Sequence, residues 1–126
     1  MRRDIGLLIL RAATGLMMLV GHGWSKLVNF GQIAPSFPNP FGIGGSATLA
    51  FVIFAEVFCA IAVIAGIFTR YAVIPLIITM LGAALVIHGV DPWSKKEMSL
   101  LFLVPFVTLF FTGAGDLSVD KFRTKA

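Results

Sequence analysis

Four long apolar segments, separated by short polar turns, constrain this chain more than any other feature. A helix needs about 20 mostly apolar residues to cross the hydrocarbon core of a bilayer. The segments give predicted spans at about residues 5–22, 47–68, 71–88 and 97–113. Each span must be helical, because an open sheet edge cannot lie in lipid. We therefore predict an all-α fold, an integral membrane four-helix bundle that forms a single domain over residues 1–126.

Composition supports a membrane protein. The chain is 58% hydrophobic and 13% charged, whereas a soluble domain has about 25% charged residues. The net charge of +4 could suit nucleic acid, but the basic residues lie at segment ends and form no stripe. We therefore expect the lipid bilayer, and no nucleic acid, as a partner. The single cysteine, Cys59, excludes an internal disulfide and a CxxC site carried by this chain alone.

The distribution of lysine and arginine predicts the orientation. Most of them lie at the N-terminus, at Arg70 and in the C-terminal tail, whereas Lys26, Lys95 and Lys96 lie at the opposite ends of the spans. The positive-inside rule then places both termini in the cytoplasm, in the plasma membrane of a bacterium or archaeon. The loop at 23–46, rich in proline, phenylalanine and glycine, faces outward. It lies either in the membrane interface or on the surface as a partly ordered loop.

Two charged residues, Arg11 and Glu56, fall inside the predicted spans. A charge at the centre of a span costs about 2.5–3.5 kcal/mol, so each is a functional hypothesis by default. At the helical rise, Arg11 lies about 9 Å and Glu56 about 18 Å from the cytoplasmic end. A long guanidinium can bridge much of this gap, and we predict a buried Arg11–Glu56 ion pair. The alternative is a protonated Glu56 that bonds a neighbouring helix.

A polar set is predicted at the outer end of the bundle. His22 and Lys26 continue, at helical spacing, the face of the first span that begins at Arg11. His88 ends the third span and Glu97 opens the fourth, so all four side chains are expected at one membrane level. We take His22, His88 and Glu97 as candidate catalytic residues. They could relay protons to a redox-active ring or donate hydrogen bonds to it.

Lys26, Trp24 and Trp93 are candidate ligand-binding residues at the same level. Each also has a simpler explanation, because tryptophan is enriched at membrane interfaces and lysine reaches toward the headgroups. Two histidines and a glutamate form a ligand set used for zinc or iron, but no fixed spacing such as HExxH is present, and we predict no metal site. A small transporter or anion binder that uses Lys26 and the histidines is disfavoured, because the chain shows no internal repeat or pair of broken helices.

An ordered set of motifs resembles the DoxX family of small four-helix membrane proteins. The first span with its arginine is followed by "HGWSKL", a second span with an internal glutamate, "GIFTRYA" and, near the end, "GAGDLSVD". The resemblance covers nearly the whole chain, although Asp116 departs from the usual pattern. The matching positions are Arg11, His22, Gly23, Lys26, Leu27, Glu56, Arg70, His88, Glu97, Gly113 and Gly115.

The family is named for a subunit of a thiosulfate:quinone oxidoreductase. The resemblance therefore implies a quinone-interacting subunit or accessory of a membrane oxidoreductase, with a periplasmic or membrane redox partner. Quinone is the cofactor that the resemblance implies, and the chain carries no haem, flavin or iron–sulfur signature. The alternative is a non-catalytic scaffold that docks a redox or secreted partner through the loop at 23–46. Whether the chain is itself an enzyme stays open, and the one-sided polar faces suggest a homodimer.

Overall fold

The computed structural model describes residues 1–39 and 42–125 of the protein. Within these ranges the chain forms helices joined by short loops and contains no strand. The α-helices are α1 (Arg2–Met18), α2 (Trp24–Val28), α3 (Phe30–Ile33), α4 (Gly45–Ile53), α5 (Ala60–Ala65), α6 (Thr69–Gly82), α7 (Trp93–Thr112) and α8 (Val119–Lys125). Three π-helical segments are η1 (Leu19–Gly23), η3 (Phe54–Cys59) and η4 (Ala83–Ile87), and a 3₁₀ turn is η2 (Ala34–Ser36).

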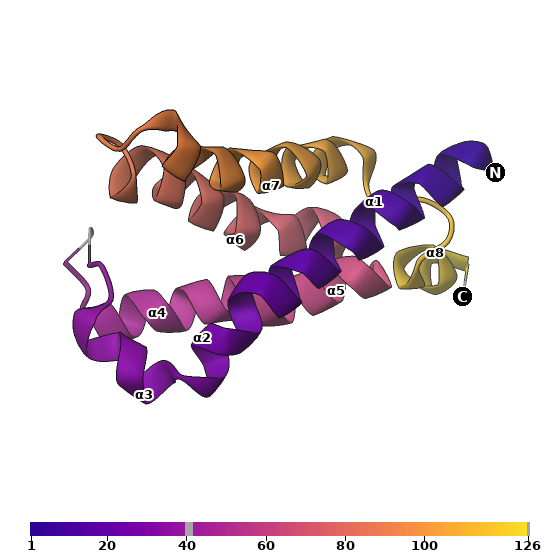
Figure 1. Ribbon diagram of the computed structural model, residues 1–126. Coiled ribbons are helices and arrows are strands. Elements are labelled where there is room, and N and C mark those ends of the chain that lie inside the picture. The colour runs from indigo at the N-terminus through magenta and orange to yellow at the C-terminus, as the bar shows by residue number, and fades with distance from the viewer. Residues whose placement is uncertain (40–41, 126) are drawn as a thin grey trace.

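These elements join into four long helical segments (Figure 1). By length and composition, three of them can cross a membrane: Arg2–Val28, Gly45–Ala65 and Thr69–Ile87. The fourth, α7, is 20 residues long, but it carries Lys95, Lys96 and Glu97 close to its start. The all-helical fold is therefore confirmed for the described residues, together with three helices suited to a membrane.

The first helical segment is longer than predicted. It continues through α2 to Val28 instead of ending near residue 22. Leu27 and Val28 extend the apolar pattern, and no proline occurs before Pro35. The helix therefore includes the first part of the loop predicted at 23–46. The rest of that loop holds α3 and η2, while Pro40 and Phe41 lie outside the described residues.

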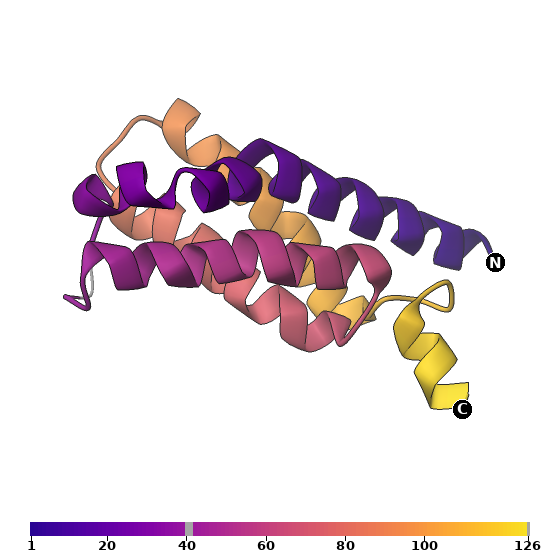
Figure 2. The same ribbon diagram turned by 90° about the horizontal axis from the view of Figure 1, so that it is seen from below.

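The long segments pack around one another. The helix α1 contacts α5 and α7, and α6 contacts α5, η3 and α7. Both chain termini lie at the same end of the molecule, as two views at right angles show (Figures 1 and 2). The helix α3, the start of α4 and the start of α7 lie at the opposite end (Figure 1). We call this the distal end.

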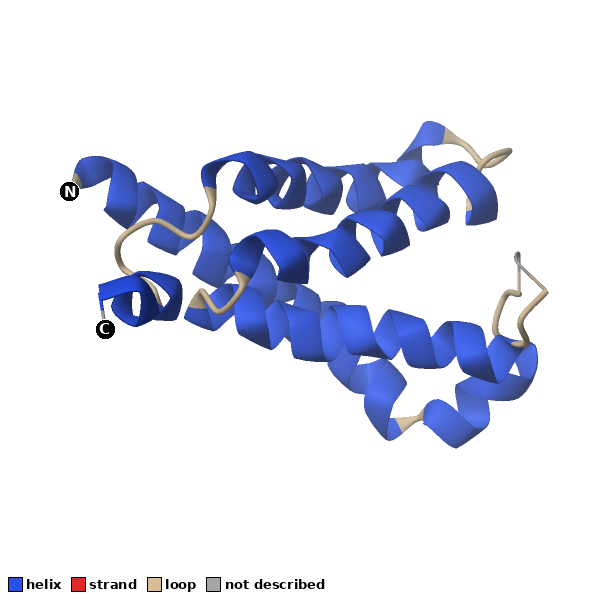
Figure 3. Cartoon of the chain, turned by 180° about the vertical axis from the view of Figure 1, so that it is seen from behind, coloured by secondary structure: helices blue, strands red, loops and turns tan. Residues whose placement is uncertain are grey.

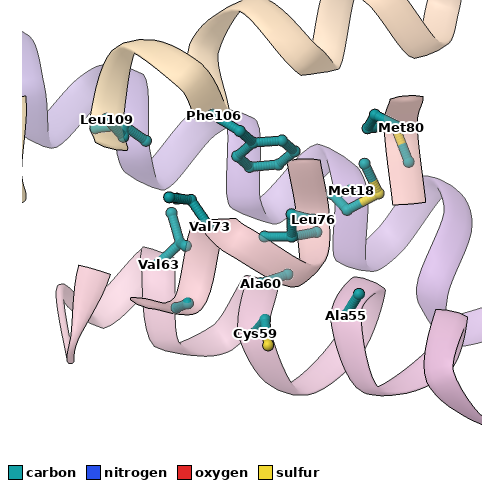
Figure 4. Close-up of a cluster of buried hydrophobic side chains, with 11 residues drawn as sticks. Met18, Ala55, Cys59, Ala60, Val63, Val73, Leu76, Met80, Phe106 and Leu109 are labelled. Atoms are coloured by element: carbon teal, nitrogen blue, oxygen red, sulfur yellow. The ribbon is translucent and has the colours of Figure 1, made fainter. Parts of the chain in front are cut away.

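The core lies where all four segments meet. Met18 of α1, Leu76 of α6 and Phe106 of α7 are buried in one apolar cluster, which Cys59 also joins (Figure 4). Large apolar side chains cover the outer surface as well; Ile9, for example, is 62% exposed. A surface with so many exposed apolar side chains suits contact with lipid.

Arg11 ties the terminal end of the molecule together. The residue is 2% exposed, and its guanidinium donates hydrogen bonds to three carbonyl oxygens, those of Ile64 at 3.3 Å, Ala114 at 2.7 Å and Leu117 at 2.7 Å. The planar fork of donors on arginine suits such a set of acceptors. The predicted Arg11–Glu56 ion pair is therefore wrong, because Arg11 binds main-chain oxygens at this end of the molecule.

Asp120 completes the same junction from the C-terminal segment. Its carboxylate accepts hydrogen bonds from the backbone N–H groups of Phe68, at 2.6 Å, and Thr69, at 3.0 Å. These amides open α6, where an acceptor is needed because the first N–H groups of a helix have no partner within it. The turn between α5 and α6 is thus fastened to the segment that follows α7.

We expect Arg11→Met to lower the free energy of unfolding by about 2–4 kcal/mol, because three buried carbonyl oxygens lose a charged donor. The measurement is the melting temperature of the purified protein in mild detergent. Arg3→Met makes the same chemical change at an exposed arginine and should leave that temperature nearly unchanged. Equal effects of the two substitutions would contradict a structural role for the Arg11 hydrogen bonds.

Candidate functional site

A pocket of about 520 Å³ opens between α4 and α6 at the distal end. Figure 3 shows these two helices from behind, with the loop before α4 beside them. The volume lies in the range of about 300–1,000 Å³ that is typical of small-molecule sites. The lining residues are Lys26, Phe37, Pro38, Ile43, Thr48, Phe51, Val52, Glu56, Ile78, Thr79, Met80, Gly82, Ala83 and Ile87.

One ion pair supplies the charge of this otherwise apolar pocket. Lys26 Nζ lies 2.6 Å from Glu56 Oε1. The glutamate side chain is 3% exposed, whereas the lysine side chain is 26% exposed. Among the described residues that line the pocket, these two are the charged ones. The lysine is thus the accessible partner, and the carboxylate lies beneath it, inside a membrane-suited helix.

Three π-helical segments lie around this end of the pocket. Glu56 belongs to η3, and Ala83 and Ile87 of η4 line the opposite wall. The segment η1 packs against η3. A π-helical turn widens a helix and redirects its side chains, and such turns are frequent at functional sites. Each of the three membrane-suited segments therefore departs from regular α-helix near the pocket or the ion pair.

Gly23, the last residue of η1, allows the close approach of the two helices. A Cβ atom at Gly23 would lie 2.5 Å from the carbonyl oxygen of Glu56 and 2.9 Å from a methyl group of Val57. The absence of a side chain therefore lets the first segment contact the backbone of Glu56. Lys26, one turn further along, is brought within reach of the carboxylate.

The loop before α4 covers one side of the pocket with Phe37, Pro38 and Ile43. Phe37 also packs against a small apolar cluster that contains Leu49. The loop is held by the side-chain oxygen of Asn39, which accepts a hydrogen bond from the backbone N–H of Gly44 at 2.9 Å. Phe37, Pro38 and Ile43 of this loop thus form part of the pocket wall.

His22 lies beside the ion pair, although it does not line the pocket. Its ring meets Phe102 of α7 edge to face, with ring centroids 5.2 Å apart. It also interacts electrostatically with Glu56 and Lys26. Of the three candidate catalytic residues, His22 is therefore the one that lies next to the charged pair.

The other two candidate catalytic residues lie elsewhere. His88 Nδ1 is 2.8 Å from Asp91 Oδ2 in the turn after η4, and the Glu97 side chain is exposed on α7. No hydrogen bond or ion pair joins the side chains of His22, His88 and Glu97, all of which the structure describes. The predicted convergence of these three residues on one site is therefore not observed.

The two tryptophans also lie outside the pocket. Trp24 is 56% exposed and Trp93 is 64% exposed. Trp93 opens α7 at the distal end, where its exposure suits the interface anchor that was the alternative explanation. Trp24 opens α2, directly after Gly23, which contacts the backbone of Glu56. In the described part of the chain, no group of three His, Cys, Asp or Glu side chains is placed to hold a metal ion.

The sequence analysis did not predict that Lys26 pairs with Glu56, although the depth of Glu56 in the membrane pointed to this pairing. The estimated depth of Glu56, about 18 Å from the cytoplasmic side of a core about 30 Å thick, already lies beyond the midplane. A cation from the outer end is therefore closer to it than Arg11. The threonines of the pocket, Thr48 and Thr79, carry no comparable signal in the sequence.

The comparisons with known proteins gave one finding. The model of the DoxX family matches residues 6–89, two thirds of the chain. The matched range includes all the residues that line the pocket, whereas α7 and α8 lie beyond it. The comparisons with curated proteins and with solved structures returned no match.

We expect Gly23→Ala to destabilise the protein, because the added methyl group collides with the backbone of Glu56. Gly21→Ala is the matched control two residues earlier, where a Cβ meets nothing within 4 Å. That substitution should be neutral or stabilising by up to about 1 kcal/mol, because alanine favours helix over glycine. Opposite shifts in melting temperature are expected, and equal shifts would contradict the role given to Gly23.

We expect Lys26→Met to lower the free energy of unfolding by about 3–5 kcal/mol, since it leaves the buried Glu56 carboxylate without its partner. Adding Glu56→Gln to this variant should restore most of the loss, because the unpaired charge is removed. The double-mutant cycle is measured by thermal unfolding in detergent. Strictly additive effects would contradict direct pairing of the two side chains.

Proposed function

Since the chain belongs to the DoxX family, we propose that it is a membrane protein that binds a quinone in the pocket between α4 and α6. In this role it is a subunit or accessory of a membrane oxidoreductase. The observation that carries the proposal is the combination of apolar walls with one charged pair, Lys26 and Glu56. Pockets of this kind bind ligands that are mostly apolar and have a few polar atoms.

A quinone matches that chemistry. Its ring and isoprenoid tail are apolar, and its carbonyl oxygens accept hydrogen bonds. Lys26 carries three N–H donors, one of which faces Glu56 at 2.6 Å. A second donor can bond a quinone carbonyl while the ion pair stays intact. The tail would follow the apolar side chains of Phe51 and Ile78, which line the pocket and are 40% and 51% exposed.

Reduction of a quinone to a quinol consumes two electrons and two protons. In the proposed function the electrons come from a partner protein, since the sequence carries no haem, flavin or iron–sulfur signature. Glu56 lines the pocket and is the proposed proton donor to the bound ring, with His22 as the titratable group near it. His88 and Glu97 lie apart from this group and have no assigned step.

The proposed setting is the plasma membrane of a bacterium or archaeon. The four long segments would span it as a four-helix bundle with both termini in the cytoplasm, as the distribution of basic residues predicts. The distal end, with Trp93 and the loop that covers the pocket, would then lie at the outer face of the membrane. A periplasmic or membrane-bound electron donor could reach it there, and a homodimer is compatible with this arrangement.

The alternative function is a scaffold that docks a partner through the loop at 23–46. Such docking needs apolar side chains that face away from the molecule. Phe37 and Pro38 instead line the pocket, and Phe37 also packs against the core cluster of α4. These contacts favour a role of Phe37 and Pro38 in covering the pocket, whereas Val28, at 58% exposed, is a loop side chain that such docking would use.

The test of quinone binding uses the space beside Gly82. This residue lines the pocket, and a Cβ atom added there meets nothing within 4 Å. A side chain can therefore start at this position without a clash at Cβ, and Gly82→Trp should place an indole in the pocket. We expect the affinity for a short-chain quinone, measured by calorimetry in mild detergent, to fall by about tenfold or more, which corresponds to about 1.4 kcal/mol.

Gly6→Trp is the matched control, because Gly6 on α1 also faces open space and lies outside the pocket. It should bind quinone as the wild type does. A wild-type protein that binds no quinone and retains none through purification, as judged by mass spectrometry, would refute the proposal. Capture of a defined redox protein that depends on the loop but not on Gly82 would instead favour the scaffold.

A further inference from the structure

We propose that Glu56 is a selectivity residue, which makes the pocket accept amphiphiles with uncharged head groups and reject those with anionic head groups. The inference deepens the proposed function and rests on the pocket that it uses. A membrane exposes any such pocket to a large excess of lipids and fatty acids with apolar tails. Tail burial alone cannot separate these molecules from a quinone, so the polar end of the pocket must do so.

The pair Lys26–Glu56 has no net charge. The ammonium is its accessible member, with 26% of the side chain exposed against 3% for the carboxylate. The other described residues that line the pocket are uncharged. His22 is the further titratable group beside the pair, and it interacts with both members. A head group that enters the pocket therefore contacts Lys26, whose positive charge is already neutralised by the buried carboxylate of Glu56.

An uncharged acceptor can use this lysine at little cost. The ammonium has three N–H donors. Among the described residues, Glu56 is the one that accepts a hydrogen bond from Lys26 Nζ. A carbonyl or hydroxyl oxygen can take a free donor while the 2.6 Å contact with Oε1 is kept. The desolvation of the pair is then unchanged, and one polar contact is added.

An anionic head group faces a different balance. A carboxylate or phosphate that binds Lys26 must approach the carboxylate of Glu56, which repels it in a region of low dielectric constant. If it displaces Glu56 from the lysine, it leaves a buried charge without a partner, which is strongly unfavourable. Discrimination by a repulsive element of this kind is a common route to specificity.

The backbone around Glu56 has little room to shift, so the carboxylate cannot move away from an incoming anion. Glu56 lies in the π-helical η3, and its carbonyl group is packed directly against Gly23 of η1. The helix cannot move toward Gly23 to carry the carboxylate away from an incoming anion. The repulsive charge therefore stays at the pocket wall, and removing it is the direct test.

The test compares two spin-labelled probes that share one tail, a doxyl-labelled fatty acid and its methyl ester. Both are titrated into the protein in nanodiscs of zwitterionic lipid, at alkaline pH where the acid is ionised, and the immobilised fraction is measured by electron paramagnetic resonance. Wild-type protein should bind the ester more tightly than the acid by about tenfold. Glu56→Gln should reverse this preference, because Lys26 is then a cation without a counter-charge.

Two further variants test whether the change in preference comes from the Lys26–Glu56 pair. Lys26→Met/Glu56→Gln should lose the gain in acid binding, because the attracting cation is gone. Asp116→Asn is the matched control: it neutralises an exposed carboxylate, 62% accessible and outside the pocket, and should keep the wild-type preference. A Glu56→Gln variant that still prefers the ester would overturn the inference.

The wild type alone also tests the inference, should Glu56→Gln fail to fold. Equal binding of acid and ester by the wild type would overturn it. Failure of the proposed function is a separate result. A wild type that prefers the ester but binds no quinone supports the selectivity and rejects quinone as the ligand. A wild type that binds quinone and both probes equally retains the proposed function and rejects the role of Glu56.

Discussion

A carboxylate buried within an apolar helix is the constraint on which the site depends. Glu56 is 2% exposed, and a charge in such surroundings must be paired. Lys26 meets this need from the helical extension beyond the first predicted span, where the chain would otherwise have turned away at residue 22. The first segment continues to Val28, and Gly23 lies against the backbone of Glu56, so Lys26 can reach the carboxylate.

Buried polar groups find their partners in different ways at the terminal end and at the pocket. At the terminal end, Arg11 and Asp120 satisfy main-chain oxygens and amides and fasten the C-terminal segment to the α5–α6 turn. Those contacts lie away from the pocket. At the pocket, the Lys26–Glu56 pair keeps N–H donors of the lysine available at the wall. The terminal end is therefore suited to stability, and the pocket to recognition.

The π-helical segments coincide with the pocket and with the helix contact beside it. Regular α-helices with a continuous apolar core pack closely and leave few voids. Here η3 carries Glu56, η4 provides part of the opposite wall, and η1 presents Gly23. The core residues Met18, Leu76 and Phe106 are fully buried (Figure 4). The pocket thus lies where the helices leave regular geometry, beside this core, from which Met80 also lines the pocket.

The sequence by itself determined the helical fold, three membrane-suited segments and the family, because apolar length and motif order are local properties of the chain. It also identified Glu56, Lys26 and His22 as residues of interest from their position in or near apolar segments. It assigned Glu56 the wrong partner, and it grouped His88 and Glu97 with His22. Partner choice depends on helix rotation, on π-helical turns and on the close approach at Gly23, none of which leaves a periodic signal. The tertiary structure alone decided which charges meet and where the pocket lies.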